Sequence, residues 1–408
     1  MMKYLVVIAD GMADRAVDLL GGRTPMEAAR KPAMDALAKK AFCGLVSNVP
    51  AGMVPESDTA NLAILSYDPR VYSKGRSPLE AVSMGIDMHP DETAYRCNLV
   101  TLSEEGETRY ADRRMLDHSA DEITTDEARQ LIYALDQALG DENRRLYTGI
   151  SYRHCLIWRD APGEYPFERP HDIIGKCIST HLPSGIEGLP YLEMMEKSFE
   201  ILKNHPVNQE RRRRGLKPAN SIWLWSPGKK PALPSFSEKW SLRGAVISAV
   251  DLIKGIGLCA SMQSIDVEGA TGNLYTNYKG KAEAARSAFE EGYDFVYVHV
   301  EAPDECGHRG EAENKVLAIE NIDNMILEPL WQYLQGLGEP YKIMVLPDHP
   351  TPVALRTHTM DPVPFLIYNS AKAEQGIAMF SEAQAAETGV LITDGCRLME
   401  FFIESEKI

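Results

Sequence analysis

Short apolar runs rich in valine and isoleucine recur along the chain, and segments with a helical pattern separate them. The runs lie at 4–8, 245–247, 295–298, 342–346 and 364–368. Continuous apolar runs of this length are typical of parallel strands that helices cover on both faces. Helical patterns occupy 24–41, 280–293 and 313–338. Because strand and helix alternate, the sequence predicts a doubly wound α/β fold around a mostly parallel sheet.

The middle of the chain has a different pattern. Shorter strand candidates at 94–102 and 154–160 are mixed with polar loops and with a helical pattern at 124–140. This pattern predicts a smaller α+β domain inserted at 91–221. Residues 1–90 and 222–408 then form one discontinuous catalytic domain, and the insert is expected to act as a substrate-binding cap over a site at the edge of the sheet.

Charge and cysteine content exclude several classes of protein. The formal net charge of -16 would repel a polyanion, so no nucleic-acid partner is expected. One basic run, 211–214, is interpreted as a solvated face.

No apolar run approaches the length of a membrane span, and the first residues are too short for the apolar core of a signal peptide. Seven cysteines, an odd number with no CxxC spacing, indicate reduced thiols and a cytoplasmic protein. No feature indicates an oligomeric state.

Carboxylates and histidines follow three of the apolar runs. Ligands of open α/β sheets bind outside the carboxyl ends of the strands, so these positions are where chemistry is expected. The candidate side chains after the runs are Asp10, Asp304, His308, Asp348, His349 and, slightly further on, His358.

The spacing of these residues suggests metal binding. Asp304 and His308 are four apart, which on a helical turn puts both side chains on one face. Asp348 and His349 are adjacent and would point in different directions, so they could serve different ions. A single Asp or His after a strand is usually a helix cap or a turn residue. Three of only ten histidines follow strands of one sheet, however, and this coincidence favours a two-metal site with Mn²⁺, Mg²⁺ or Zn²⁺.

Ser57 is the candidate nucleophile. It follows a loop with Gly52 and Pro55 and precedes the helical pattern DTANLAIL. It could serve only as a helix N-cap. It would also be well placed to attack a phosphate, because free N–H groups at a helix N-terminus attract the anion.

Together these motifs resemble a known family. Asp10-Gly11, PESDTAN, HVEAPDECGH, PDHPTP and RTHTMDPVPF occur in this order, and the middle segments RCNLVTL, GISYRHCLIW, PHDIIGK and SIWLWSPGKKPALPSF match as well. They resemble the cofactor-independent phosphoglycerate mutases of the archaeal type, within the alkaline phosphatase superfamily. The resemblance spans nearly the whole chain and implies an alkaline-phosphatase-like fold with an inserted cap.

The resemblance implies specific roles for the candidate residues. Ser57 would be the phosphorylated nucleophile, and Lys254 would neutralise phosphate charge near it. One divalent ion would be held by Asp10, Ser57, Asp348 and His349, and the other by Asp304, His308 and His358. The ions would be Mn²⁺ or Mg²⁺, possibly Zn²⁺, and 2,3-bisphosphoglycerate would not be required.

The cap is expected to bind the anionic groups of a small phosphorylated substrate. Arginine is the usual bidentate partner of phosphate and carboxylate. Arg76, Arg96 and Arg153 are the candidates, and His154 could relay a proton to the substrate. A solitary histidine is, however, more often a packed or capping residue.

Two activities within the family fit the sequence, and a plain phosphomonoesterase is a third interpretation, expected if the cap admits water. The first is interconversion of 3-phosphoglycerate and 2-phosphoglycerate through a phosphoserine on Ser57. The alternative is a homoserine kinase of the same family, which would transfer phosphate from ATP to homoserine. The chain has no P-loop, but this superfamily would bind a nucleotide without one. The chain departs from the family pattern at SADEI, where Gly-His is usual after serine-alanine, and at Pro350, where serine is usual; both departures concern the acceptor.

Overall fold

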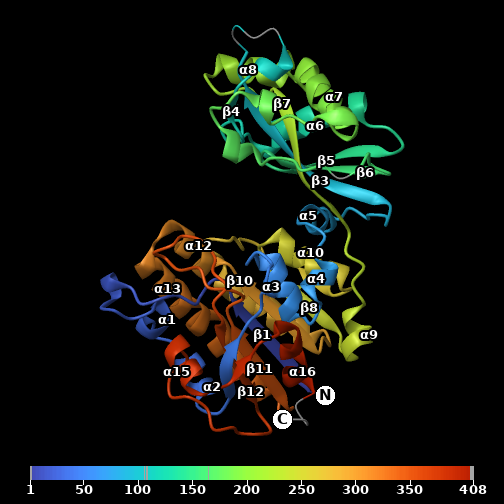
Figure 1. Ribbon diagram of the computed structural model, residues 1–408. Coiled ribbons are helices and arrows are strands. Elements are labelled where there is room, and N and C mark those ends of the chain that lie inside the picture. Colours follow the sequence, from blue (N-terminus) through green and yellow to red (C-terminus); the bar gives the residue numbers. More distant parts are fainter. Residues whose placement is uncertain (1, 105, 107–108, 164, 405–408) are drawn as a thin grey trace. The chain divides into compact units, whose positions relative to one another are not determined.

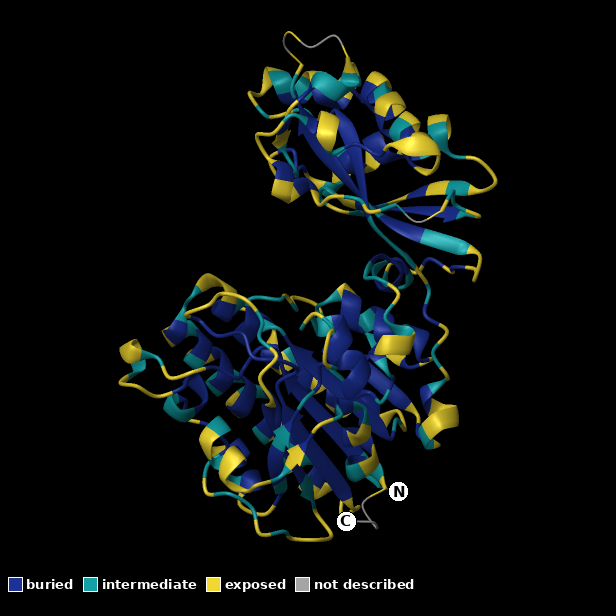
Figure 2. Ribbon diagram, in the orientation of Figure 1, coloured by how far each residue is buried: buried dark blue, intermediate teal, exposed yellow. Residues whose placement is uncertain are grey.

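The structure is a computed structural model that describes residues 2–104, 106, 109–163 and 165–404. It divides into two compact units. The first unit consists of Met1–Ser73 and Ala232–Ile408, and the second of Lys74–Pro231. Each unit has its own sheet and its own core (Figures 1 and 2).

An eight-stranded sheet forms the centre of the first unit. Its strand order is β13-β2-β12-β11-β1-β10-β8-β9. The strands are β1 (Lys3–Ala9), β2 (Phe42–Val46), β8 (Gly244–Ile247), β9 (Gln263–Ile265), β10 (Phe295–Val300), β11 (Tyr341–Leu346), β12 (Val363–Asn369) and β13 (Leu391–Ile392). All five apolar runs that the sequence marks as strands are strands of this sheet.

One strand runs in the direction opposite to the prediction. β12 is antiparallel to both β11 and β2, whereas β1 pairs in parallel with β10 and β11. A parallel return from β11 to β12 would need a crossover, which is usually a helix. The connection 347–362 contains no helix, so the chain returns antiparallel. The sheet remains mostly parallel.

Helices cover both faces of this sheet, which confirms the doubly wound α/β fold (Figure 1). On one face, helices α2, α11, α13 and α14 pack on the side chains of Leu5, Val296 and Ile343. On the other face, Tyr297 hydrogen-bonds to Asn61 of α3 and the ring of Tyr4 contacts Phe402 of α16. The helices are α1 (Pro25–Ala28), α2 (Pro32–Ala38), α3 (Ser57–Ile64), α4 (Pro69–Tyr72), α9 (Phe236–Trp240), α10 (Asp251–Cys259), α11 (Tyr278–Glu290), α12 (Ala302–Arg309), α13 (Ala312–Ile322), α14 (Glu328–Gly336), α15 (Glu382–Glu387) and α16 (Leu398–Ile403).

Proline determines where two of the predicted helices are divided. The segment 24–41 forms two helices because Pro32 begins α2 and disfavours a helical conformation at Lys31 before it. The segment 313–338 is helical as far as Gly336, but a π-helical turn, Asp323–Leu327, joins α13 to α14 just before Pro329. Proline cannot donate a backbone hydrogen bond, which is one reason a helix changes its pattern at such a position.

The second unit contains an antiparallel sheet with helices. Its strands are β3 (Glu92–Leu102), β4 (Met115–Asp117), β5 (Arg144–Ile150), β6 (Arg153–Arg159) and β7 (Ser221–Lys229). The long strand β3 pairs with β4, β6 and β7. Its helices are α5 (Ser77–Ser83), α6 (Thr125–Leu139), α7 (Gly185–Leu202) and α8 (Pro206–Arg213).

The second unit is longer than the insertion that the sequence predicts. The expected boundaries are 90/91 and 221/222, whereas the compact unit begins at Lys74 and ends at Pro231. Helix α5 belongs to it because Ala81 packs with Ala94 of β3 and Ile157 of β6. The later end has a similar cause, since β7 remains paired with β3 as far as Lys229.

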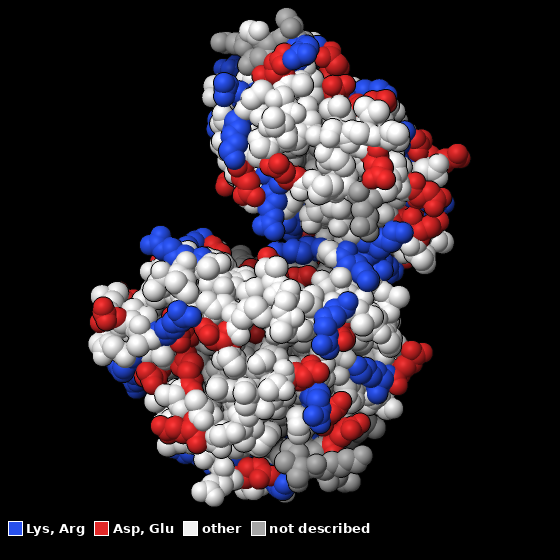
Figure 3. All heavy atoms as spheres, in the orientation of Figure 1, with Lys and Arg blue, Asp and Glu red and all other residues white. Residues whose placement is uncertain are grey.

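Charged side chains of both signs are spread over the face of the molecule in Figure 3. The basic run in α8 is not simply a solvated face. Arg211 is 1% exposed and pairs with Glu127, and Arg212 and Arg214 pair with Glu104 and Glu127. Among the described residues, no helix is both long and apolar enough to cross a membrane.

Candidate active site

The predicted metal ligands meet at one edge of the first unit's sheet. Strands β11, β1 and β10 are neighbours and run in parallel, so their carboxyl ends lie side by side. Asp10 follows β1, and Asp348 and His349 follow β11. Helix α12 begins directly after β10 and carries Asp304 and His308.

Asp304, His308 and His358 form the first cluster of possible metal ligands. The Nε2 atoms of His308 and His358 are 2.9 Å apart. Asp304 Oδ2 lies 3.3 Å from His308 Nε2, and Asp304 Oδ1 lies 3.4 Å from His358 Nε2. Three donor atoms from two distant segments therefore converge on one point.

The hydrogen bonds of the two rings explain why a cation suits this point. His308 Nδ1 lies 3.0 Å from the carbonyl of Arg356, and His358 Nδ1 lies 2.6 Å from the carbonyl of Pro55. A carbonyl only accepts, so each Nδ1 carries the proton and, in the neutral ring, each Nε2 presents a lone pair. Two lone pairs cannot face each other at 2.9 Å unless a proton or a metal ion lies between them. Fixing a histidine tautomer through its second nitrogen is typical of metal ligands.

The pKa shifts of this cluster also favour a bound cation. Burial opposes the ionisation of Asp304, but its hydrogen bonds with His308 and His358 hold its pKa well below the usual value. The hydrogen bond with Asp304 raises the pKa of His308 to about 9. The cluster thus carries a buried carboxylate that demands a cation, and a divalent ion would displace the proton from His308.

Asp10, Asp348, His349 and Ser57 form the second cluster. His349 Nε2 lies 3.7 Å from Asp10 Oδ1, 3.6 Å from Asp348 Oδ2 and 3.2 Å from Ser57 Oγ. Asp10, Asp348 and His349 are each at most 2% exposed. Asp10, Asp348 and Ser57 therefore surround the Nε2 atom of His349, the fourth side chain that the family resemblance assigned to this ion.

Burial of several ionisable groups strains this cluster electrostatically. Burial and the nearby Asp348 raise the pKa of Asp10 well above its usual value. Burial also disfavours ionisation of Asp348, yet the neighbouring His349 and His299 lower its pKa. Two carboxyl groups so deeply buried are costly unless a cation compensates them. Moreover, Asp10 Oδ1 is a buried oxygen without a hydrogen-bond partner among the described residues. Both features fit a divalent ion.

Ser57 is the first residue of α3, as the sequence suggested. Its backbone is tied to the ligand cluster through Asn61, whose side-chain amide donates to Ser57 O at 2.8 Å and to Asp348 Oδ2 at 2.9 Å. Tyr297 in turn donates to Asn61 Oδ1 at 2.5 Å. The helix start thus holds the hydroxyl beside the ligands and presents backbone N–H groups to an anion.

Several residues of the site escaped the sequence analysis. Asn61 bridges Ser57 and Asp348, Thr351 donates to Asp304 at 2.5 Å, and His299 lies 3.1 Å from Asp10. His299 also forms a third possible ligand group with Asp10 and Asp348. The only sequence signal was a histidine inside the apolar run of β10, where a polar side chain needs a reason.

Lys254 lies on α10, which packs against α3. Its Nζ donates to Asp266 at 2.6 Å. Lys254 also helps lower the pKa of the buried Lys281, which burial brings to about 8. The role of Lys254 in neutralising phosphate stays a prediction.

The four substrate-binding candidates belong to the second unit. Arg76 precedes α5, and Arg153 begins β6. Arg96 on β3 hydrogen-bonds Glu80 and stacks over Trp225. His154 is 4% exposed and accepts a hydrogen bond from Gly149 N at Nδ1, and burial lowers its pKa to about 3. Their roles in substrate binding stay predictions.

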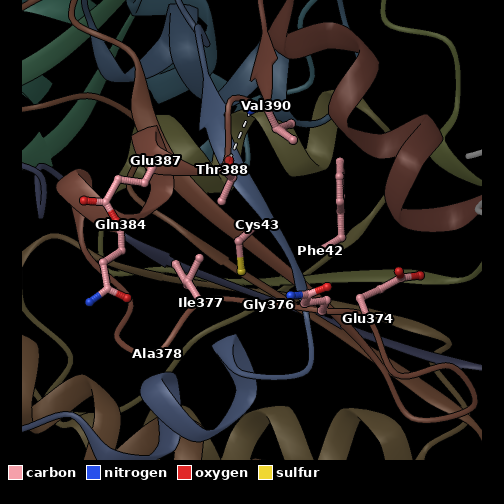
Figure 4. A pocket seen from close by; sticks show the side chains of 11 residues that line it. Phe42, Cys43, Glu374, Gly376, Ile377, Ala378, Gln384, Glu387, Thr388 and Val390 are labelled. Atoms are coloured by element: carbon pink, nitrogen blue, oxygen red, sulfur yellow. Dashed lines mark hydrogen bonds between the residues drawn. The ribbon is translucent and has the colours of Figure 1, made fainter.

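A pocket of about 510 Å³ lies elsewhere in the first unit (Figure 4). It is lined by Phe42 and Cys43 at the beginning of β2 and by Glu374, Glu387 and Thr388 among others. The carboxyl ends of β1, β10 and β11 hold the ligand clusters, whereas this pocket lies at the amino end of β2, which runs in the direction of β11. None of the candidate active-site residues lines it.

Comparison with known proteins identifies the family. A family model of 2,3-bisphosphoglycerate-independent phosphoglycerate mutase matches residues 38–208. A probable 2,3-bisphosphoglycerate-independent phosphoglycerate mutase of Geobacter sulfurreducens is 46% identical over 99% of this chain and 100% of the relative. The chain belongs to this family. The mutase of Methanosarcina barkeri, 48% identical over 96% of each chain, is a second such relative.

Solved structures agree with membership of this mutase family. The cofactor-independent phosphoglycerate mutase from Thermoplasma acidophilum is 28% identical, with a TM-score of 0.70, over 99% of this chain and 100% of that chain. A Pyrococcus horikoshii protein, whose name states no activity, has a TM-score of 0.81 at 28% identity over 99% and 97% of the two chains. The fold and the motifs thus point to the same family.

Proposed function

We propose that this protein interconverts 3-phosphoglycerate and 2-phosphoglycerate through a phosphoserine on Ser57. The observation that carries the proposal is the position of Ser57: the first residue of a helix, with Oγ 3.2 Å from His349 Nε2 and beside two buried carboxylates. The relatives described above are named mutases, which favours this activity over the homoserine kinase of the same family.

Two divalent ions fit the residues. Asp10, Ser57, Asp348 and His349 would hold one, and Asp304, His308 and His358 the other; Mn²⁺ or Mg²⁺ is expected, with Zn²⁺ also compatible with the donor set. When bound, the ions would lower the pKa of a hydroxyl and neutralise charge on the phosphate. 2,3-bisphosphoglycerate has no role in this scheme, because Ser57 itself carries the phosphate.

The protein's side chains would perform two displacements. The Ser57 hydroxyl loses its proton as Oγ attacks the phosphorus in line, the Oγ–P bond forms, and the bond from phosphorus to the glycerate oxygen breaks while that oxygen takes up a proton. Glycerate then reorients, its other hydroxyl loses a proton and displaces Ser57 Oγ from the phosphorus, and Oγ takes up a proton again. Dividing the exchange in this way replaces one difficult transfer by two similar ones.

Positive groups would bind the substrate's charges. Lys254 is proposed to neutralise phosphate beside Ser57. Arg76, Arg96 and Arg153 of the second unit are proposed to bind the substrate carboxylate and phosphate, because guanidinium pairs with both in bidentate fashion. His154 is the proposed proton relay; its low pKa keeps it neutral, so it could act only by exchanging its single ring proton.

Phosphorus NMR tests the activity directly. Purified protein with Mn²⁺ and 3-phosphoglycerate, without nucleotide or bisphosphoglycerate, should form 2-phosphoglycerate until equilibrium. A second sample with ATP and homoserine should show no phosphohomoserine. If the first reaction is silent and the second proceeds, the kinase is the correct activity. Release of inorganic phosphate alone would indicate a phosphomonoesterase.

A further inference from the structure

His299 is a buried histidine that the proposed mechanism does not use. It is the last residue but one of the apolar strand β10 and is fully buried. Side chains alternate along a strand, so His299 points to the face of the sheet that Tyr297 shares with α3. A buried imidazole is costly unless both its nitrogens are engaged, so its partners require an explanation.

Three neighbouring strands bring its partners together. Ser248 follows β8, His299 lies on β10, and Asp10 follows β1; these strands are adjacent in the order β1-β10-β8. Ser248 Oγ is 3.2 Å from His299 Nδ1, and His299 Nε2 is 3.1 Å from Asp10 Oδ2. The main chain is also held, since Lys281 Nζ donates to the carbonyl of His299 at 2.7 Å.

The hydrogen bonds of Ser248 determine which ring nitrogen carries the proton. Val250 N–H donates to Ser248 Oγ at 3.0 Å and occupies one lone pair. Within the described part of the chain, the only other partner of this hydroxyl is His299 Nδ1, so its hydrogen points to that nitrogen. Nδ1 then accepts, and the ring proton of the neutral histidine resides on Nε2.

A protonated Nε2 is a donor and not a metal ligand. The alternative, in which His299 completes a metal group with Asp10 and Asp348, would need a lone pair on that atom. In this structure Nε2 has no hydrogen bond of good geometry among the described residues, and it lies beside Asp10 Oδ2. The other oxygen, Asp10 Oδ1, is the unpartnered one and lies on the side of His349.

We propose that His299 is a positioning residue, which donates from Nε2–H to Asp10 Oδ2 and so directs Oδ1 of that carboxylate toward the metal ion. Ser248 fixes the tautomer that makes this possible. The proposal rests on the metal centre of the proposed function. It goes beyond that centre by naming two residues, His299 and Ser248, that control the orientation of a ligand rather than bind the ion.

Mn²⁺ affinity distinguishes this role from others. His299→Gln retains a side-chain N–H near the position of Nε2, whereas His299→Leu fills similar space without a donor. We expect His299→Leu to weaken the binding of one of the two Mn²⁺ ions by about 10- to 100-fold, with the other changed less than about threefold. His299→Gln should stay within about fivefold of the original protein. Electron paramagnetic resonance titration of the metal-free protein measures both ions without requiring turnover.

The outcomes separate the possible explanations. Equal losses of Mn²⁺ affinity in the Gln and Leu variants would overturn the proposal. They would show that His299 acts as a metal ligand or only by packing, since an amide donor replaces neither. Unchanged binding in both would also overturn it. Should His299→Leu fail to fold, Ser248→Ala decides: its loss of Mn²⁺ affinity is expected to be about threefold to tenfold, and no loss would contradict the proposal. A protein that binds two ions but forms no 2-phosphoglycerate would refute the proposed function and leave the role of His299 intact.

Discussion

At the scale of single residues, the candidate ligands are held in place by neighbours that do not themselves need to bind metal. Carbonyl oxygens of Arg356 and Pro55 set the tautomers of the two ring ligands in the first cluster. Asn61 and Gly11 N donate to Asp348 in the second. Such partners orient the ligand atoms before an ion arrives, which lowers the cost of assembling the site.

Removal of the nucleophile should abolish transfer while the metal centre remains. Ser57→Ala should lower mutase kcat by about 10³-fold or more, because no other hydroxyl replaces the covalent step. Mn²⁺ binding should weaken but persist, since Asp10, Asp348 and His349 remain. Ser287→Ala, an exposed serine on α11, is the matched control and should keep full activity. Full activity in Ser57→Ala would refute the mechanism.

The buried His154 should make the protein sensitive to acid. Burial lowers its pKa from 6.5 to about 3, so the folded protein keeps it neutral while the unfolded chain takes up a proton below pH 6.5. Its stabilising contribution is therefore complete above pH 6.5 and is lost as the pH falls toward 3. Between pH 7.5 and 5 the loss should be about 2 kcal/mol.

His154→Asn tests this assignment, because asparagine keeps an acceptor for Gly149 N but does not titrate. Urea unfolding at pH 7.5 and at pH 5 measures the free energy of unfolding of both proteins. The variant should be less stable at pH 7.5, and the difference from the original protein should shrink by about 2 kcal/mol at pH 5. An equal difference at both pH values would show that His154 is not the acid-sensitive group.

The sequence predicted ligands better than the residues that support them. Asp10, Asp348 and His349 could be found because a parallel sheet brings strand ends together, whatever the details of packing. Asn61, Thr351 and Ser248 left no comparable signal, since a polar residue near a helix start or in a loop is common. His299 differs from its neighbours in the sequence only as a polar residue between Val298 and Val300, and its role depends on the neighbours that two other strands provide.

At the scale of elements, the turn after β1 allows β1 and α12 to approach closely. Gly11 has φ of +64°, a conformation that favours glycine, and a Cβ there would lie 2.7 Å from Asp304 Cα and 2.6 Å from Thr351 Oγ1. The backbone of the turn thus lies directly against Asp304 of the first ligand cluster and against Thr351, which donates a hydrogen bond to it. A side chain at this position would have to displace α12 or Thr351.

Gly11→Ala should therefore damage the metal centre more than a strained backbone alone would. Gly21 has a similar φ of +69°, and no atom of the described residues lies within 4 Å of an added Cβ, so Gly21→Ala measures the cost of the conformation only, about 1 to 2 kcal/mol. Gly11→Ala should lose at least about 1 kcal/mol more and weaken Mn²⁺ binding by tenfold or more. Thermal unfolding and Mn²⁺ titration compare the two variants. Equal effects would show that the close approach is unimportant.

Strands could be predicted where the local residue pattern determines them. The direction of a strand could not, because it depends on the connection before it. The five apolar runs are all strands because their residues are buried on both faces. The direction of β12 depends on the helix-free connection before it, which periodicity does not reveal. The short strands β9 and β13 were missed because two or three residues carry no detectable period.

At the scale of the whole molecule, the second unit has what an independent domain requires. It contains its own sheet and a core that includes Tyr95, Leu131, Phe199 and Trp223. Its two ends are adjacent, because a Cβ added at Gly228 would meet Lys74 O. Neighbouring termini are typical of inserted domains that fold by themselves.

We expect a fragment of residues 74–231 to fold alone, with cooperative thermal unfolding by circular dichroism. The matched fragment 91–221, with the boundaries that the sequence suggested, lacks α5 and all of β7 except its first residue, and it exposes the small cluster of Ala94, Cys155 and Ile157. It should unfold at a lower temperature or aggregate. Equal stability of the two fragments would place the domain boundary at the sequence-based positions.

Formation of a phosphoserine on Ser57 can be observed directly. The protein is mixed with Mn²⁺ and 3-phosphoglycerate, quenched in acid within milliseconds, digested and analysed by mass spectrometry. The peptide containing Ser57 should gain the mass of one phosphate group, located on Ser57, in the original protein and not in Ser57→Ala. Rapid formation of 2-phosphoglycerate with no phosphate on Ser57, or with phosphate on another residue, would contradict it.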